Sequence, residues 1–349
     1  MLNKRITISV DAMGGDLGPS VTIPAIAKAC ELHPDVAFLI FGIEADVRPF
    51  INAHPILLER SEFIPCDIAI TMDEKPGSAL RRGRKVSSMW QSIDAVKADN
   101  AHASISAGNT GALMAMSKVV LRMNQGIERP ALAAIWPTLR GESIVLDVGA
   151  TIGCSASQYA QFAIMGRAYA RVVLGIADPS VALLNLGVED MKGTDVIKEA
   201  AEVIGELGLN YIGFIEGDGI GRGEADVIVT DGFTGNVALK TAEGTARQIT
   251  TMLSDAIKAS WMSRIGYIFA RSAFNVLKER LDPNASNGGI FLGLNGVVIK
   301  SHGGADVSGF TSAIEVAIEV SKAKINQIIS RDIDDMQIVL ENAWAERLE

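Results

Sequence analysis

Short apolar runs alternate with amphipathic stretches along most of the chain. The runs at 6–10, 36–42 and 181–187 have the length and composition of buried strands. Turns and stretches with apolar positions at helical spacing follow such runs. This alternation is typical of an α/β fold with a mainly parallel sheet flanked by helices.

The same pattern predicts the remaining elements. Further strands are expected at 103–108, 131–136, 143–148, 211–216 and 226–230, and a last apolar strand runs from about 289 to 299. Helices are expected from about 21, at 90–97, 113–123 and 155–174, from 237, and at 312–330. The chain has no internal repeat, low-complexity tract or clear linker, so we expect a single domain over 1–349.

The turn after the strand at 103–108 has the composition of an anion-binding site. Gly108, Asn109, Thr110 and Gly111 lead into a helix whose first backbone N–H groups lack intrahelical acceptors. Small residues let a phosphate or carbonyl oxygen approach the backbone, while Asn109 and Thr110 add side-chain donors. An ordinary turn capped by Asn109 or Thr110 explains the same residues. We predict that phosphate binds at this helix start.

Two other glycine-rich turns follow strands, at 11–16 and 231–236. Asp11 and Asp16 flank the glycines of the first turn, where they could orient a catalytic group, bind a metal, or cap the turn and the next helix. Asn236 ends the second turn. Because α/β proteins place ligands at the carboxyl edge of the sheet, we expect the turns at Asp11, Asn109 and Asn236 to converge there.

Composition narrows the classes of function. The chain has 349 residues, 48% of them hydrophobic, and a formal net charge of -9, which argues against general nucleic-acid binding. Cys30, Cys66 and Cys154 form no CxxC pair, so neither a disulfide framework nor a zinc site is predicted. The sequence shows no membrane-spanning run and no signal-peptide pattern at 1–6, and a cytoplasmic protein is therefore expected.

A basic run interrupts this acidic chain. Arg81, Arg82, Arg84 and Lys85 fall within five positions after a loop-like segment at 73–77. They form either a solvated, charged loop or a docking site for an acidic partner.

A basic amphipathic segment lies at about 254–281. Trp261, Ile265 and Phe269 follow helical spacing, with lysines and arginines between them. Such a composition suits a helix that lies on an anionic membrane surface. A helical pair buried against the core or a second subunit would show the same apolar stripe.

Five segments together resemble the phosphate acyltransferase family. They lie at 11–16, 106–112, 146–150, 231–236 and 299–303, in the order and spacing of that family. The resemblance implies a three-layer, Rossmann-like fold similar to isopropylmalate dehydrogenase and phosphotransacetylase. It implies a homodimer that transfers a fatty acyl group from acyl carrier protein to inorganic phosphate, without a metal or other cofactor. The acyl phosphate would pass to a membrane-bound glycerol-3-phosphate acyltransferase.

The resemblance also implies which residues act. Catalytic roles are expected for Asn109, Lys192 and Asn236, with Lys192 as a cation for phosphate or the developing oxyanion and Asn236 as an amide donor. A lysine in a turn after a strand, as Lys192 is, is otherwise usually solvent-exposed. Substrate binding is expected from Asp11, Gly14, Gly15, Asp16, Gly108, Thr110, Gly111, Asp147, Thr234, Gly235 and His302.

The chain departs from the family pattern at two places, and two other functions stay open. Thr151 stands where the family usually has Asn, and the segment 288–293 is bulkier than usual. The alternatives are a coenzyme A-dependent phosphotransacetylase and a non-catalytic, lipid-binding membrane scaffold. A phosphotransacetylase would release thiol in the presence of phosphate from acyl-coenzyme A rather than from acyl carrier protein. A membrane scaffold would show no phosphate-dependent thiol release.

Overall fold

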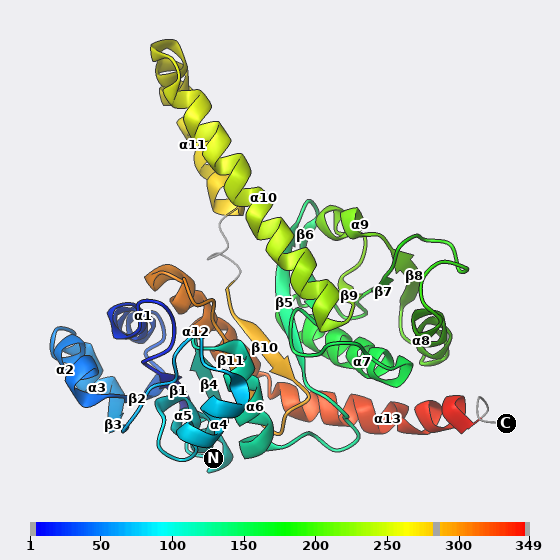
Figure 1. The fold of residues 1–349 in the computed structure, drawn as a ribbon, viewed down its shortest axis with the longest axis horizontal. Coiled ribbons are helices and arrows are strands. Elements are labelled where there is room, and N and C mark those ends of the chain that lie inside the picture. Colours follow the sequence, from blue (N-terminus) through cyan, green and yellow to red (C-terminus); the bar gives the residue numbers. More distant parts are fainter. Residues whose placement is uncertain (1–4, 282–286, 346–349) are drawn as a thin grey trace.

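The computed structural model describes residues 5–281 and 287–345 (Figure 1). The strands are β1 (Ile6–Asp11), β2 (Val36–Gly42), β3 (Ser61–Pro65), β4 (Ala103–Ser106), β5 (Ala131–Thr138), β6 (Gly141–Leu146), β7 (Val181–Leu184), β8 (Tyr211–Ile215), β9 (Val227–Val229), β10 (Gly289–Leu292) and β11 (Val297–Lys300). The helices are α1 (Pro19–Leu32), α2 (Glu44–Asn52), α3 (Ile56–Arg60), α4 (Pro76–Gly83), α5 (Ser88–Lys97), α6 (Thr110–Leu121), α7 (Ala156–Val173), α8 (Asp195–Glu206), α9 (Gly217–Arg222), α10 (Gly232–Lys258), α11 (Trp261–Leu281), α12 (Val307–Lys322) and α13 (Ile325–Ala345).

The strands form an 11-stranded sheet in the order β3-β2-β1-β4-β11-β10-β5-β6-β9-β7-β8. Two parallel parts, β3-β2-β1-β4-β11 and β6-β9-β7-β8, flank an antiparallel centre. There, β10 pairs antiparallel with both β11 and β5, and β5 pairs antiparallel with β6. The predicted mainly parallel sheet is confirmed, but its two parallel parts run in opposite directions.

Two central hairpins were not predicted. The run at 289–299 is two antiparallel strands rather than one, because the chain turns at Gly293, whose φ of 90° suits glycine. The strands at 131–138 and 141–146 are joined by a two-residue turn and pair directly. The predicted last helix is likewise two helices, α12 and α13, which are separated at Lys324 by a φ of 55°.

Helices cover both faces of the sheet, as expected for three layers. Ile8 and Val10 of β1 belong to the buried cluster that includes α1, α7 and α12. Ser9 points to the opposite face, where its Oγ donates to the Ser92 carbonyl of α5 at 2.6 Å. A second buried cluster on that face includes α5, α6 and α9.

Helices α10 and α11 form a pair that projects away from the rest of the protein (Figure 1). Helix α10 begins at Gly232 rather than 237, because the Asp231 carboxylate accepts hydrogen bonds from the first-turn N–H groups of Phe233 and Thr234. The predicted segment at 254–281 therefore comprises the end of α10, a short turn and α11. The interpretation in which this pair is buried against the core is wrong, because Trp261 is 71% exposed and Phe269 is 85% exposed.

The start of α10 packs tightly on the loop after β6. A Cβ atom at Gly235 would overlap the carbonyl of Asp147, whereas one at Gly244, farther along the same helix, would meet nothing within 4 Å. These two glycines therefore give a matched test of the packing.

We predict that Gly235→Ala lowers the free energy of unfolding by about 1–3 kcal/mol, because the added methyl group forces α10 and the loop apart. Gly244→Ala should instead raise this free energy by up to about 1 kcal/mol through helix propensity. Urea unfolding of both variants measures the difference. Equal stabilisation by both substitutions would show that the contact at Gly235 does not constrain the fold.

Candidate active site

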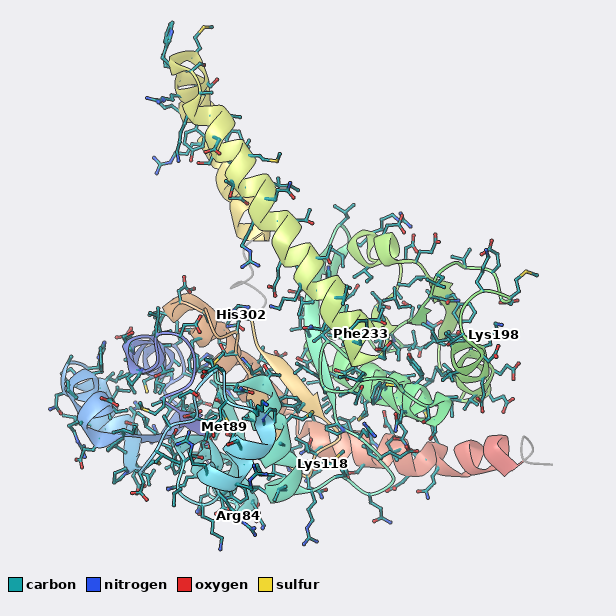
Figure 2. All side chains as sticks on the ribbon, viewed as in Figure 1. Arg84, Met89, Lys118, Lys198, Phe233 and His302 are labelled. Carbon is teal, nitrogen blue, oxygen red and sulfur yellow. The ribbon has the colours of Figure 1, made fainter. Side chains whose placement is uncertain are left out.

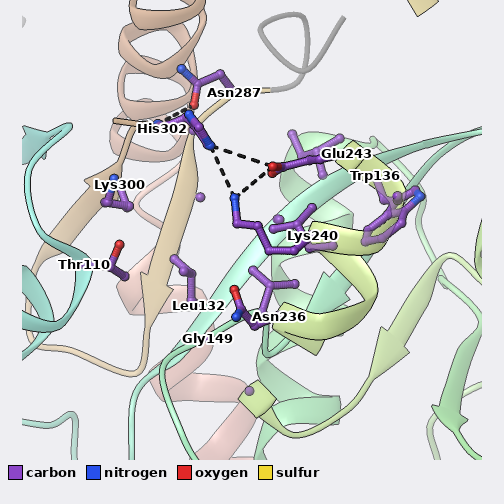
Figure 3. Close-up of a pocket in the computed structure, with 18 of the residues that line it drawn as sticks. Thr110, Leu132, Trp136, Gly149, Asn236, Lys240, Glu243, Asn287, Lys300 and His302 are labelled. Carbon is purple, nitrogen blue, oxygen red and sulfur yellow. Dashed lines mark hydrogen bonds and ion pairs between the residues drawn. The ribbon is translucent and has the colours of Figure 1, made fainter. Parts of the chain in front are cut away.

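A cavity of about 550 Å³ lies where the two parts of the sheet meet (Figure 3). It is bounded by β5, the loop after β6, the first turns of α10, the start of α6 and the facing ends of β10 and β11. Its labelled lining residues in Figure 3 are Thr110, Leu132, Trp136, Gly149, Asn236, Lys240, Glu243, Asn287, Lys300 and His302.

The cavity has an apolar wall and a polar side. Leu132 and Trp136 of β5 and Phe233 and Leu239 of α10 line the apolar part. The charged side chains come from α10 and from the end of β11. Such a cavity suits a ligand with a long apolar group and an anionic or strongly polar end.

Lys240, Glu243 and His302 form a charged cluster at the cavity. Lys240 Nζ lies 2.8 Å from Glu243 Oε2 and 3.4 Å from His302 Nε2. His302 Nδ1 accepts a hydrogen bond from the Gly304 N–H at 3.2 Å. Burial, followed by the charge of Lys240, lowers the pKa of His302, which keeps the ring neutral near pH 7.

Lys300 is a buried cation on the same cavity. Only 9% of the residue is exposed, and its Nζ donates to the Ala107 carbonyl at 3.3 Å and to the Ser301 carbonyl. Burial, together with Lys240, lowers its pKa to about 8. No ion pair joins Lys300 to a carboxylate within the part of the chain that the structure describes.

Asn109 caps helix α6, as one of the two sequence interpretations holds. Its Oδ1 accepts from the Ala112 N–H at 3.0 Å, and its Nδ2 donates to the carbonyls of Met72 and Glu74 at 2.8 and 2.9 Å. The amide is therefore occupied within the protein. The N–H groups of Thr110 and Gly111, the first two of the helix, have no intrahelical acceptor.

The turn at 11–16 supports the start of α6 but does not line the cavity. Buried Asp11 accepts from the Ser106 hydroxyl at 2.7 Å, and Ser106 Oγ accepts from the Gly108 N–H at 3.0 Å. A Cβ atom at Gly14 would lie 2.6 Å from the Gly108 nitrogen. The pKa of Asp11 is raised by burial.

The same turn also meets the loop after β11. The Asp16 N–H donates to the Gly303 carbonyl at 2.8 Å, and a Cβ atom at Gly15 would lie 2.9 Å from that oxygen. The described residues contain no group of three or more histidine, cysteine, aspartate or glutamate side chains that could hold a metal. Asp11 and the Asp16 N–H thus connect this turn to the turns after β4 and β11.

Asp147 organises the loop on the opposite side of the cavity. Its carboxylate accepts five hydrogen bonds, from the N–H groups of Leu132, Gly149, Ala150 and Thr151 and from the Thr151 hydroxyl. Burial raises the pKa of Asp147, and these hydrogen bonds oppose part of the rise. The atypical Thr151 thus holds this carboxylate rather than facing the cavity.

The structure brings Asn236 to the cavity, but not Lys192. Asn236 lies beside Gly149, whereas Lys192 sits in an exposed loop and Thr234 binds the capping Asp231 at 2.7 Å. Strands β7 and β9 are neighbours, so the Lys192 loop leaves the sheet beside the turn that carries Asn236. Thr110 and Asn236 therefore meet at the cavity, whereas the turn at 11–16 meets the turn at 108–111 without reaching the cavity.

The basic run falls on helix α4 and the turn after it, not on a loop. The Arg82 guanidinium is held by hydrogen bonds to Glu74 Oε2 at 2.6 Å and to the Ala69 carbonyl at 2.9 Å. Arg81, Arg84 and Lys85 are exposed (Figure 2 labels Arg84). Helix α4 packs on α6, so these three cations lie on or directly after a helix that contacts the one bordering the cavity.

The apolar residues of α11 lie on the projecting pair. Trp261, Ile265 and Phe269 are all exposed in the protein, as are Met262 and Ile268. No helix in the described part of the chain has the length and apolar character needed to cross a membrane. The side chains of 277–281, including the predicted cations there, lie outside the described residues.

Three cavity residues were missed by the sequence interpretation. Lys240 and Glu243 stand three positions apart on α10, a spacing that puts them on one helix face, but the sequence does not say which face meets the cavity. Lys300 ends an apolar strand, and a lysine in that position is a sequence feature that could have indicated a functional residue.

Comparison with known proteins places the chain among enzymes of lipid synthesis. A family model described as fatty acid synthesis protein matches residues 6–328. A phosphate acyltransferase from Brucella canis is 55% identical over 331 residues, which cover 94% of this chain and 96% of that protein. A phosphate acyltransferase from Afipia carboxidovorans is 55% identical over 336 residues, covering 94% and 95%.

Solved structures with a similar fold are phosphotransacetylases. One from Streptococcus pyogenes has a TM-score of 0.61 at 16% identity and covers 93% of this chain and 95% of that one. The EutD phosphotransacetylase from Staphylococcus aureus has a TM-score of 0.58 at 16% identity, covering 92% and 94%. The predicted likeness to the phosphotransacetylase fold is confirmed.

Proposed function

This chain belongs to the phosphate acyltransferase family and is an acyltransferase; we propose that it moves a fatty acyl group from acyl carrier protein to inorganic phosphate, giving acyl phosphate. The observation that supports this best is the cavity, because it combines an apolar wall for an acyl chain with amide and cationic groups for the reacting centre. The enzyme needs no metal or other cofactor in this scheme.

The reaction requires positioning more than acid–base chemistry. A phosphate oxygen attacks the thioester carbonyl carbon, and the tetrahedral intermediate then collapses with cleavage of the carbon–sulfur bond. The carrier's sulfur leaves as thiolate and takes up, through solvent, the proton that the attacking hydrogen phosphate loses. Phosphate held at the start of α6 would meet the N–H groups of Thr110 and Gly111, as the sequence predicted.

Asn236 is suited to stabilise the oxyanion. It lies across the cavity from Thr110, and an amide donor placed there would bind the charge that develops on the carbonyl oxygen (Figure 3). Lys192 stays a proposed cation for the same chemistry, although its loop would have to move toward Asn236 to reach the cavity. The glycines at 14, 15, 108 and 235 contribute by letting the surrounding turns approach closely.

We predict that Asn236→Ala lowers turnover about 10²- to 10³-fold, because one oxyanion donor is lost. Turnover is measured as thiol release from acyl carrier protein in the presence of phosphate. The control is Asn52→Ala, at an exposed position of α2, which should keep wild-type turnover.

The same assay tests the function itself. Release with acyl carrier protein and not with acyl-coenzyme A supports the proposal, and the reverse preference identifies a coenzyme A-dependent phosphotransacetylase. Binding of an acyl ligand without phosphate-dependent thiol release would instead support the non-catalytic, lipid-binding scaffold. Wild-type turnover in Asn236→Ala would exclude Asn236 from the reaction.

The exposed cations of the basic run are proposed to dock the acidic carrier protein. We predict that replacing Arg81, Arg84 and Lys85 together by Glu raises the KM for acyl carrier protein roughly 3- to 30-fold at low salt and flattens its salt dependence. Replacing Lys28, Lys97 and Lys118 by Glu changes the net charge equally and should leave this KM within about twofold. Equal effects of the two triple variants would reduce the basic run to a solvated surface.

The projecting pair is proposed to bind anionic membrane surfaces reversibly, which would place the enzyme in the cytoplasm with peripheral membrane contact. We predict that replacing both Ile265 and Phe269 by Asp abolishes co-sedimentation with anionic vesicles, because the apolar face of α11 is lost. Leu58→Asp, at another exposed apolar position, should leave binding unchanged.

This membrane test also addresses the proposed homodimer. If the double variant becomes monomeric in size-exclusion chromatography with light scattering, the apolar face of α11 is a subunit contact. Unchanged vesicle binding by a folded double variant would contradict the membrane proposal.

A bound acceptor enzyme, proposed to use glycerol 3-phosphate, would receive the product at that surface.

A further inference from the structure

Lys300 is a buried cation for which the described residues provide no ion-pair partner. Its ammonium is buried and lies at the end of β11, where it donates to two backbone carbonyls and forms no ion pair with any described carboxylate. Burial of a cation without a counter-ion is unfavourable, so such a group is retained for a ligand more often than for stability.

We infer that Lys300 is the cation that binds the phosphate nucleophile, together with the first N–H groups of α6. This inference rests on the proposed acyl transfer to phosphate, and it adds to that function a catalytic residue that contacts the attacking group.

The contacts of Lys300 place it at the right end of the cavity. Its Nζ donates to the Ala107 carbonyl at 3.3 Å, and Ala107 precedes Thr110 by only three residues. In the sheet, Lys300 is the register partner of Ser106, the last residue of β4. Lys300 and Thr110 both line the cavity and lie near one another in Figure 3, away from Trp136.

The surrounding charges favour an anion at this point. A lysine ammonium has three N–H donors, and two of them are used by the carbonyls of Ala107 and Ser301. The positive end of the α6 dipole faces the same region. Lys240 adds a second positive charge, and Asp16 on the turn after β1 is the acidic group that acts on Lys300. A bound phosphate would restore the pKa of Lys300, which burial lowers to about 8, toward its ordinary value.

Two phosphate groups could use this chemistry, namely inorganic phosphate and the phosphodiester of the carrier's prosthetic group. The buried position of Lys300 favours the small inorganic ion, because the phosphodiester is attached to a protein that stays outside the cavity. The cations of this enzyme that we propose to dock the carrier lie instead on the exposed surface of α4 and the turn after it.

The test is steady-state kinetics of Lys300→Met, with Lys118→Met at the other end of α6 as the control. We expect the KM for inorganic phosphate to rise roughly 10- to 100-fold, as for loss of a charged hydrogen bond, while the KM for acyl carrier protein stays within about threefold. Phosphate should raise the melting temperature of the wild type and of Lys118→Met, but not that of Lys300→Met. Lys300→Gln, which keeps an N–H donor without the charge, replaces the Met variant if the latter does not fold.

Other outcomes overturn the inference in distinct ways. A higher KM for acyl carrier protein alone would assign Lys300 to the prosthetic-group phosphodiester. A lower melting temperature with an unchanged phosphate KM would make Lys300 a structural tie between Ala107 and Ser301. If the wild type shows no phosphate-dependent thiol release, the proposed function fails, and the melting-temperature shift still decides whether Lys300 binds phosphate.

Discussion

Two buried carboxylates hold the turns on which the cavity depends. On one side, Asp11 fixes Ser106, whose hydroxyl in turn accepts from the Gly108 N–H just before α6 begins. On the other side, Asp147 gathers the loop after β6 through five hydrogen bonds, and the start of α10 packs directly on that loop. Neither carboxylate is placed to react with a ligand in the cavity. Their effect is to fix backbone groups that would otherwise be mobile, which is what positioning catalysis requires.

The reversal of strand direction explains why a cavity forms between these turns. In a fully parallel sheet, all carboxyl ends meet at one edge and the ligand lies outside it. Here β5 and β10 run antiparallel to their neighbours, so the start of β10 and the end of β11 face the turns after β6 and β9 across β5. The apolar surface of β5 thereby becomes the floor of the cavity, with polar groups supplied from both parts of the sheet.

Strands and helices with strong periodicity could be predicted from the sequence, because local composition decides them. The turn at 108–111 and Asn236 could also be predicted, since a glycine-rich turn before a helix has a local signal. The pairing of the strands could not be predicted in the same way. The hairpins of β5 with β6 and of β10 with β11 depend on which strands meet, and apolar runs do not encode their direction.

The role of a side chain could be predicted less well than its position. Asn109 looked like a donor for substrate, but its amide is used by the Ala112 N–H and by the carbonyls at 72 and 74. Lys240 and Glu243 were not singled out in the sequence, and only the direction in which α10 packs turns them toward the cavity. Tertiary contacts of this kind are set by residues far away in sequence.

Helix α10 connects the chemistry to the exposed apolar surface. Asn236 stands near its start and Lys258 at its end, so at 1.5 Å per residue the two are roughly 30 Å apart. If α11 contacts a membrane as proposed, the reacting centre lies about that far from the helix turn that joins the pair. The acyl phosphate that we propose as product is an amphiphile with a charged head and a long apolar tail. Such a molecule would need an apolar path along the helix pair, and Val237, Ile249 and Met252 of α10 are exposed along that length. In the proposed reaction, the long projecting helix would then serve product transfer as well as the site, because the same element carries Asn236 at one end and adjoins α11 at the other.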